Sequence, residues 1–321
     1  MALLEIKNLT VLRESETGQK TLVSAISLHL PPGAKLAICG ESGSGKTMLC
    51  RALVSLLPRG FRLTGEIRLE SGRFSGKIDH ADQQVLEFIR GRIIGFVFQD
   101  TPASLNPVLK CGRQLSDVIA TTQNLLRLEL ATALEDLLVS VGFENPRRIM
   151  DAFPFELSGG MQQRVALAMA LAGKPEILIV DEPSTALDAI ARRDLIDLLN
   201  RRCQETGLSV IIVTHDLLNV HKFADHLLVM YAGEAIESGP AANLIEAPHH
   251  PYTQLLTAAW RALLNNQPFS PNAPEFTQNV PGCGCRFVTR CPNRRKVCLE
   301  ESPPMTVAAD GRCFHCHFPS K

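Results

Sequence analysis

Eight consecutive residues have the types and spacing of a phosphate-binding loop. Residues 40–47 read GESGSGKT, which matches the pattern G-x-x-x-x-G-K-[ST]. Glycines in such a loop let successive backbone N–H groups curl around phosphate oxygens. Lys46 can bridge the β- and γ-phosphates of a nucleotide, and Thr47 can ligate Mg²⁺. The candidate nucleotide-binding residues are Gly40, Glu41, Ser42, Gly43, Ser44, Gly45, Lys46 and Thr47.

The flanking sequence favours this interpretation over an ordinary glycine-rich turn. An apolar stretch at 34–39 predicts a buried strand before the loop, and residues 46–57 are predicted to form a helix after it. The N-terminus of that helix adds positive potential, which favours an anion. By itself, the loop indicates only that the chain binds a nucleoside triphosphate.

A second apolar stretch ends in two carboxylates. Residues 177–182 read ILIVDE. Asp181 at the strand end can hold the Mg²⁺ shell, and Glu182 can polarise an attacking water. An Asp at such a position is also a common turn or helix cap. In a chain that carries a phosphate loop, the metal and water roles are the better interpretation.

Three of four further segments have ordinary explanations when each is taken alone. Residues 157–164 read LSGGMQQR, which fits a Ser N-cap with a flexible glycine pair. His215, in the segment VTHD at 213–216, fits a capping or core histidine, and Gln99, in FVFQD at 96–100, fits a solvated strand end. The segment STALD at 184–188 lies between the acidic strand end and VTHD.

Together, these segments occur in the order and spacing of one family. Residues 1–245 resemble the ATPases of ABC transporters, and the combination is very specific. The resemblance implies that the catalytic residues are Glu182, as the carboxylate beside the water, His215, as a switch that contacts the γ-phosphate, and Gln99. The glutamine would contact Mg²⁺ and the water on a lid loop that senses a membrane partner. Mg²⁺ would then be held by Thr47, Gln99 and Asp181.

The resemblance also implies a site shared between two subunits. Ser158, Gly159 and Gly160 match the signature positions that touch the γ-phosphate of ATP on the other subunit, and residues 186–188, including Asp188, match the loop that crosses the interface. A helix N-terminus can receive an anion, and the signature cannot reach its own phosphate loop if it lies on a separate helical lobe. ATP would then join two ATPase subunits, whether identical or paralogous.

The sequence departs from the family in one place. These ATPases usually stack an aromatic residue of the N-terminal strands on adenine, and none occurs near residues 11–13. The guanidinium plane of Arg13 is the alternative stacking group there. The preference for ATP over GTP therefore rests on the resemblance.

The segments FQDTPASLNP at 98–107 and HPYTQLL at 250–256 resemble the peptide/nickel importer branch of the family. In that branch a C-terminal extension carries spaced cysteines. Here six of the ten cysteines fall in the last 39 residues. The spacing Cys285-x5-Cys291-x6-Cys298-x17-Cys316 resembles an extension in which four cysteines can hold a [4Fe–4S] cluster.

Other uses of the tail cysteines remain open. Thiolates suit zinc as well as iron–sulfur clusters. The intervals are longer than those of most zinc sites, yet Cys283 and Cys313 form tighter pairs with their neighbours, and His315 and His317 add candidate ligands. Metal-free thiols are the third alternative. The other four cysteines are interpreted as small apolar residues.

Composition excludes several classes of protein. The chain has 321 residues, with 33 Lys plus Arg balancing 33 Asp plus Glu, so no nucleic-acid partner is expected through bulk charge. No run of 18 apolar residues or signal-peptide pattern is present. A chain without such segments would have to dock onto another protein to serve a membrane. The family resemblance then implies a peripheral protein on the cytoplasmic face of the inner membrane, docked on two integral permease subunits through the groove beside the Gln99 loop. A substrate-binding protein would be an indirect partner.

The elements that position these residues alternate between strands and helices. Residues 1–38 indicate two or three antiparallel strands, 71–77 a loop and 112–172 helices. We expect an α/β fold: a P-loop NTPase core with a mostly parallel sheet, an N-terminal antiparallel β subdomain, a helical signature subdomain and a small Cys-rich C-terminal extension. The expected domains are an ATPase domain at 1–250, with its helical subdomain at about 100–172, and the extension at 251–321.

Two classes of function follow. The first is the ATPase of an importer for peptides or for a metal or metal chelate such as nickel. The second is a soluble ABC ATPase that acts on nucleic acid or ribosomes without a permease. The chain has one cassette, no long coiled-coil insertion and no basic arm, so the first class is favoured.

Overall fold

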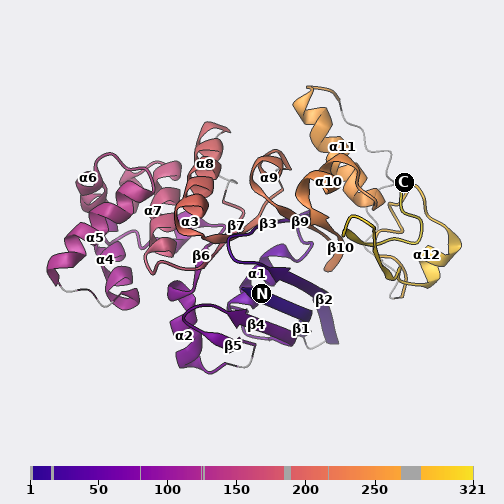
Figure 1. Cartoon of the computed structure of the whole chain (residues 1–321), viewed down its shortest axis with the longest axis horizontal. Coiled ribbons are helices and arrows are strands. Elements are labelled where there is room, and N and C mark those ends of the chain that lie inside the picture. Colours follow the sequence, from indigo (N-terminus) through magenta and orange to yellow (C-terminus); the bar gives the residue numbers. More distant parts are fainter. Residues whose placement is uncertain are drawn as a thin grey trace.

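The computed structural model describes residues 3–15, 18–79, 81–123, 125, 127–183, 189–215, 217–268 and 283–320 (Figure 1). Its main sheet, in spatial order, consists of β11 (Met305–Val307), β12 (Cys313–His315), β10 (Glu234–Pro240), β9 (His226–Tyr231), β3 (Lys35–Cys39), β8 (Ser209–Val213), β7 (Ile177–Asp181) and β6 (Ile94–Val97). The five strands from β9 to β6 pair in parallel, and the pairs that involve β10, β11 and β12 are antiparallel. The expected mostly parallel α/β core is confirmed.

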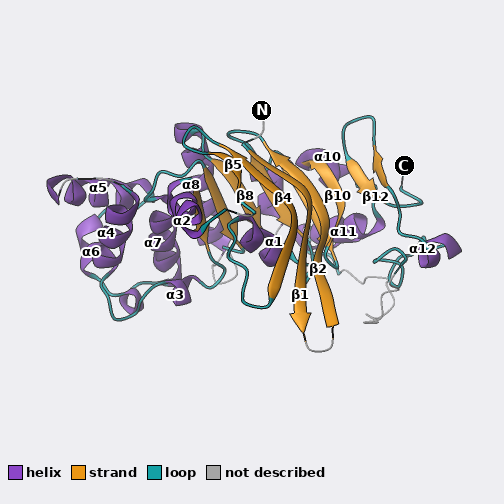
Figure 2. Cartoon of the chain, turned by 90° about the horizontal axis from the view of Figure 1, so that it is seen from below, coloured by secondary structure: helices purple, strands orange, loops and turns teal. Residues whose placement is uncertain are grey.

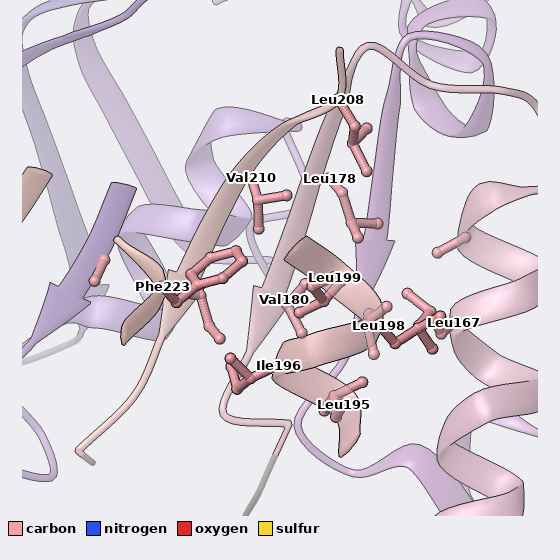
Figure 3. Close-up of a cluster of buried hydrophobic side chains, with 14 of the residues drawn as sticks. Leu167, Leu178, Val180, Leu195, Ile196, Leu198, Leu199, Leu208, Val210 and Phe223 are labelled. Atoms are coloured by element: carbon pink, nitrogen blue, oxygen red, sulfur yellow. The ribbon is translucent and has the colours of Figure 1, made fainter. Parts of the chain in front are cut away.

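The central strands are buried on both faces, which explains their continuous apolar runs. Along β7, Leu178 and Val180 belong to one buried cluster, while Ile177 and Ile179 belong to another on the opposite face. Figure 3 shows the first cluster, in which α8 (Ala189–Thr206) packs its leucines over β7 and β8. Packing on both faces fixes the position of the carboxyl end of such a strand. In β7 that end carries Asp181, and Glu182 follows it.

The N-terminal segment forms a separate antiparallel sheet, as the sequence predicts. Its order is β2 (Gly18–Leu30), β1 (Leu4–Ser15), β4 (Phe61–Glu70) and β5 (Ser75–Lys77). Figure 2 shows the long β1–β2 ribbon extending from this sheet. The predicted loop at 71–77 is wrong at its end, because Ser75–Lys77 pairs with β4 as an edge strand. A three-residue polar strand lacks the apolar alternation that sequence patterns detect.

Helices gather at one end of the molecule (Figure 1). α4, α5, α6 and α7 pack against one another there, and α3 packs on α7. The helices that precede β7 are α1 (Lys46–Leu53), α2 (Gln83–Arg92), α3 (Thr101–Ser104), α4 (Cys111–Thr122), α5 (Arg127–Ser140), α6 (Pro146–Asp151), the 3₁₀ turn Pro154–Glu156 and α7 (Gly159–Leu171). Among the described helices, none combines the length and hydropathy needed to cross a bilayer.

The C-terminal extension lies at the other end of the molecule and is joined to the main sheet. Its strand β12 pairs with β10, with Phe314 opposite Glu237 and Cys313 opposite Ser238. The helices after β8 are α9 (Leu217–Phe223), α10 (Ala241–Glu246), α11 (Pro251–Leu264) and α12 (Lys296–Glu300). The extension therefore lengthens the sheet that carries the phosphate loop.

Candidate functional site

The phosphate loop connects β3 to α1 at the carboxyl edge of the sheet. Gly40 and Gly45 are required there by both conformation and space. Gly40 has φ 154°, and a Cβ on it would lie 2.2 Å from the Met230 carbonyl oxygen. Gly45 has φ 99° and would place a Cβ 2.6 Å from the Leu22 carbonyl oxygen. No other residue type fits these positions without displacing backbone.

A cavity of about 350 Å³ opens over this loop. It is lined by Leu22, Ser42, Gly43, Gly45, Lys46, Thr47, Met48, Gln99 and Glu182. Lys46 is buried, and its ammonium donates to the carbonyl oxygens of Gly40 and Glu41, both at 2.9 Å. The buried hydroxyl of Ser44 has no hydrogen-bond partner among the residues that the structure describes. A cavity that combines loop N–H groups, hydroxyls and the Lys46 ammonium fits a chain of phosphates.

Two oxygen groups meet at the loop as a hard cation requires. The Thr47 hydroxyl lies 3.2 Å from Oδ1 of Asp181, at the end of β7. Burial raises the pKa of the Asp181 carboxyl, and the hydrogen bond from Thr47 lowers it. A divalent cation would favour the ionised carboxylate. Hydroxyl and carboxylate donors fit Mg²⁺, with Thr47 and Asp181 as the residues that would hold it.

Glu182 is held in an unusual backbone conformation beside the loop. It has φ 44°, in the left-handed region, and its N–H donates to the Val213 carbonyl oxygen at 3.0 Å. Its carboxylate accepts a hydrogen bond of 3.0 Å from Nε2 of Gln99 and lies 3.7 Å from the Lys46 ammonium. The structure therefore brings together three of the predicted site residues, Lys46, Gln99 and Glu182.

The remaining catalytic candidate, His215, is two residues beyond Val213, whose carbonyl oxygen accepts the hydrogen bond from the Glu182 N–H. His215 follows β8 and is exposed, and it does not line the cavity that contains Glu182. Asp188 and the rest of the 184–188 segment fall outside the described residues. Arg13, the proposed adenine-stacking residue, is exposed on β1 opposite Lys20 and Phe61, and it does not line the cavity either.

The signature segment begins α7. Ser158 is its N-cap, with Oγ accepting from the Met161 N–H at 3.4 Å. Ser158 and Gly160 line a second cavity of about 310 Å³, which shares no lining residue with the phosphate cavity. Buried Gln163 on the same helix accepts a 2.9 Å hydrogen bond from the buried Thr101 hydroxyl, which ties α7 to the segment after Gln99.

The cysteine-rich tail folds around a cavity of about 10 Å³. Cys285, Cys291, Cys298 and Cys316 all line it, whereas Cys283 and Cys313 do not. Burial raises the pKa of Cys285 to about 11 and also raises the pKa values of the Cys291 and Cys316 thiols. The thiol donor set fits a soft metal centre. Its arrangement does not, because within the described residues no three His, Cys, Asp or Glu side chains are placed to hold a metal ion.

The structure adds two residues from the extension to the phosphate loop. The hydroxyl of Tyr252 accepts a 2.9 Å hydrogen bond from the backbone N–H of Glu41. The guanidinium of Arg290 donates to both carboxylate oxygens of Glu41, at 2.9 and 2.8 Å. The only sequence signal was the HPYTQLL segment. In it, His250 caps α11 through Nδ1, a role that suits a neutral ring, since burial lowers the pKa of His250 to about 3.

Two separate parts of the chain match family models named for transporters. A model described as ABC transporter matches residues 23–185, and one described as Oligopeptide/dipeptide transporter, C-terminal region matches residues 236–298. A third, described as AAA domain, putative AbiEii toxin, Type IV TA system, overlaps the first and matches residues 152–220. The first model covers the phosphate loop and the acidic strand end.

Curated proteins resemble the chain along most of its length. It is 36% identical to the oligopeptide transport ATP-binding protein OppD of Bacillus subtilis, over 96% of this chain and 86% of that protein. It is 35% identical to the dipeptide transport ATP-binding protein DppD of Escherichia coli, over 99% and 97%. A putative peptide import ATP-binding protein of Brucella melitensis is 37% identical, over 98% and 94%.

Solved structures share the fold. The dimeric, post-hydrolysis ATP-binding cassette MJ0796 bound to ADP and Pi superposes with a TM-score of 0.65 at 29% identity, covering 74% of this chain and 98% of that chain. The structure of cbiO1 from Clostridium perfringens, described as part of the ABC transporter complex cbiONQ, gives a TM-score of 0.65 at 25% identity, covering 82% of this chain and 97% of that chain.

Proposed function

Because the chain belongs to the ABC transporter family and carries the C-terminal region of oligopeptide and dipeptide transporters, we propose that it is the ATP-hydrolysing subunit of a membrane importer for peptides. The relatives reported above are named for oligopeptide, dipeptide and peptide transport, which favours peptides over nickel or another metal chelate. They also make a soluble ATPase acting on nucleic acid or ribosomes the weaker alternative.

The single observation that carries the catalytic proposal is the contact of Gln99 and Lys46 with Glu182 inside the phosphate cavity. Glu182 would accept a proton from the attacking water, Gln99 would orient that carboxylate, and Lys46 would bind the transferred phosphate. Mg²⁺, when bound, supplies charge neutralisation at the phosphates. Burial of Lys46 excludes water from its ammonium, which strengthens its attraction for phosphate.

We further propose that ATP is held between two subunits. Ser158 and Gly160 line a cavity of their own, apart from the cavity over Lys46, which supports a partner in trans. The partner is a second copy or a paralogue. A relative of the same fold is described as a dimer bound to ADP and Pi.

A membrane permease would dock next to the Gln99 loop. An apolar cavity of about 250 Å³ lies there, lined in part by Phe96, Phe98 and Met169, and Phe98 is 37% exposed. Its apolar lining suits a cytoplasmic helix of two integral permease subunits, served by a substrate-binding protein. The chain would then act as a peripheral protein on the cytoplasmic face of the inner membrane.

The tail is proposed to bind a [4Fe–4S] cluster through Cys285, Cys291, Cys298 and Cys316. The four cysteines line one small cavity, which is the reason for choosing this set. As they stand, the described side chains do not form a metal-binding group, so cluster assembly would require the thiols to lose protons and draw closer together. Protein purified without oxygen should show the visible absorption of thiolate-to-iron charge transfer. Chemical analysis should give about four iron and four sulfide per chain. Stoichiometric zinc, or free thiols with neither metal, would contradict the cluster.

The test of the function is phosphate release from Mg-ATP by the purified chain, alone and with the permeases encoded beside it. We expect hydrolysis that the permeases and a peptide-loaded binding protein stimulate. Stimulation by RNA or ribosomes instead would favour the soluble alternative. Absence of nucleotide binding would contradict the proposal altogether.

A further inference from the structure

Glu41 of the phosphate loop is held at three points, two of them by the C-terminal extension. Its N–H donates to the Tyr252 hydroxyl, and its carboxylate pairs with Arg290 in a two-oxygen contact. Its carbonyl oxygen accepts from the Lys46 ammonium at 2.9 Å. One residue therefore lies between the extension and the loop's lysine.

The two holding side chains are themselves well anchored. Tyr252 is buried to 1% exposure, and its ring packs on Tyr231 and Phe287. Arg290 has only 14% of its side chain exposed, and its guanidinium lies 5.9 Å from the ring centres of Tyr231 and Phe287. One guanidinium nitrogen of Arg290 donates to both carboxylate oxygens, and hydrogen bonds between charged groups are stronger than those between neutral groups. A partly buried contact of this kind retains strength that an exposed ion pair loses.

The extension is also fastened to the sheet below this contact. The carboxylate of Glu237, 1% exposed on β10, accepts from the N–H groups of His249 and His250 at 2.7 and 3.0 Å, immediately before α11 begins. Strand β12 pairs with β10 on the same sheet. The position of Tyr252 relative to the phosphate loop is thus set by backbone contacts to the core.

We propose that Tyr252 and Arg290 are positioning residues for nucleotide binding: by holding Glu41, they fix the Lys46 ammonium where phosphate meets it. The extension is then a working part of the phosphate site as well as a tail. This inference rests on the proposed function, because it takes Lys46 to bind the phosphates of ATP. Loss of the contact of either Tyr252 or Arg290 with Glu41 should weaken nucleotide affinity. The chemical step, which depends on Glu182, should be nearly unchanged.

The test compares full-length Arg290→Gln and Tyr252→Phe with the wild type. Binding of Mg-ATP is titrated calorimetrically, KM and kcat are measured separately, and thermal unfolding is followed in parallel. We expect the Kd and KM of each variant to rise about three- to tenfold, the change that loss of one charged or well-formed hydrogen bond produces, with kcat within about twofold. Arg290→Lys, which keeps the charge, should recover part of the affinity.

The chain offers a matched control. Arg286 joins the extension to the core through Glu234 at 2.9 Å, both side chains are 29% exposed, and neither residue belongs to the phosphate loop. Arg286→Gln should leave the Kd for ATP unchanged even if it lowers the unfolding temperature as much as Arg290→Gln does. An equal rise in Kd for Arg286→Gln would overturn the positioning role in favour of general loosening of the extension.

A double variant tests whether the effect of replacing Arg290 comes from its contact with Glu41 or from another consequence of the substitution. If Arg290 acts through Glu41, the Kd of Glu41→Gln with Arg290→Gln should match that of Arg290→Gln alone. The proposal would be overturned if the increases in Kd of the two single variants multiplied in the double variant. It would also be overturned if Arg290→Gln and Tyr252→Phe both bound ATP as tightly as the wild type does. A wild type that fails to bind ATP would instead remove the proposed function on which it depends.

Discussion

The side-chain amide of Gln99 donates a 3.0 Å hydrogen bond to Oε2 of Glu182, and this joins the loop after β6 to the end of β7. The same carboxylate lies 3.7 Å from the Lys46 ammonium through its other oxygen. Gln99 is next to Phe98, which lines the apolar cavity proposed for the permease. A change at that cavity can therefore reach the carboxylate beside the phosphate loop through one residue.

Glu182→Gln should retain ATP binding and lose hydrolysis. An amide cannot accept the proton of the attacking water, so we expect kcat to fall by about 10²- to 10⁴-fold. Phosphate release and ATP affinity, measured on the same preparation, check this. Glu176→Gln is the control, since Glu176 lies before β7 and pairs with Arg73 away from the cavity. Near-normal phosphate release by Glu182→Gln would remove the residue from its proposed role.

Ser158→Arg should prevent ATP-dependent dimerisation. The large cation would fill the cavity that Ser158 and Gly160 line, and it would remove the N-cap of α7. Sedimentation with and without Mg-ATP measures the dimer. Asn145→Arg, which removes the N-cap of α6 in the same helical lobe, should still dimerise. A Ser158→Arg protein that dimerises as the wild type does would contradict the assignment of the signature.

Thr101→Val should destabilise the contact between α3 and α7. It leaves the buried Gln163 carbonyl oxygen without its hydrogen bond, beside an amide nitrogen that already has no partner. We expect a loss of about 1–3 kcal/mol in the free energy of unfolding. Urea denaturation checks this, with Thr122→Val as the control, because the Thr122 hydroxyl donates only to Val118 of its own helix. Equal stability of the two variants would mean that the buried pair contributes nothing.

Glu237→Ala should loosen the extension. Two backbone N–H groups at the start of α11 would lose their acceptor, at a cost of about 2–4 kcal/mol. The chain's one tryptophan, Trp260, lies on α11, so its fluorescence follows this region directly. We expect its transition to move to lower urea concentration, whereas exposed Glu246→Ala should not move it. An unchanged Trp260 transition in Glu237→Ala would mean that the other contacts of the extension hold it without Glu237.

Local patterns predicted the parts of the fold that depend on local physics. The apolar runs of β3 and β7 and the Ser158 cap before an apolar helix each have a signature within a few residues, and the structure contains them. The parallel sheet follows from their alternation with helices. The positions of Lys46 and Glu182 in one cavity follow in turn, because parallel strands present their carboxyl ends at one edge.

The contacts of the extension could not be predicted in this way. Arg290 and Glu41 are separated by 249 residues, and no periodicity links them. Nor does the sequence indicate that β12 pairs with β10, because a three-residue strand containing Cys313 and His315 is as typical of a metal site as of a sheet edge. The cysteine and histidine spacing predicts metal binding, whereas the residues that contact the phosphate loop are Tyr252, which precedes the cysteines, and Arg290, which lies between Cys285 and Cys291.

The most direct test of the account is a crystal structure of Glu182→Gln grown with Mg-ATP. We predict a dimer in which the γ-phosphate lies between Lys46 of one subunit and the Ser158–Gly160 helix start of the other. A nucleotide bound in the cradle of one chain, with that helix start of every neighbouring chain far from any phosphate, would contradict it and leave a generic triphosphate-binding protein.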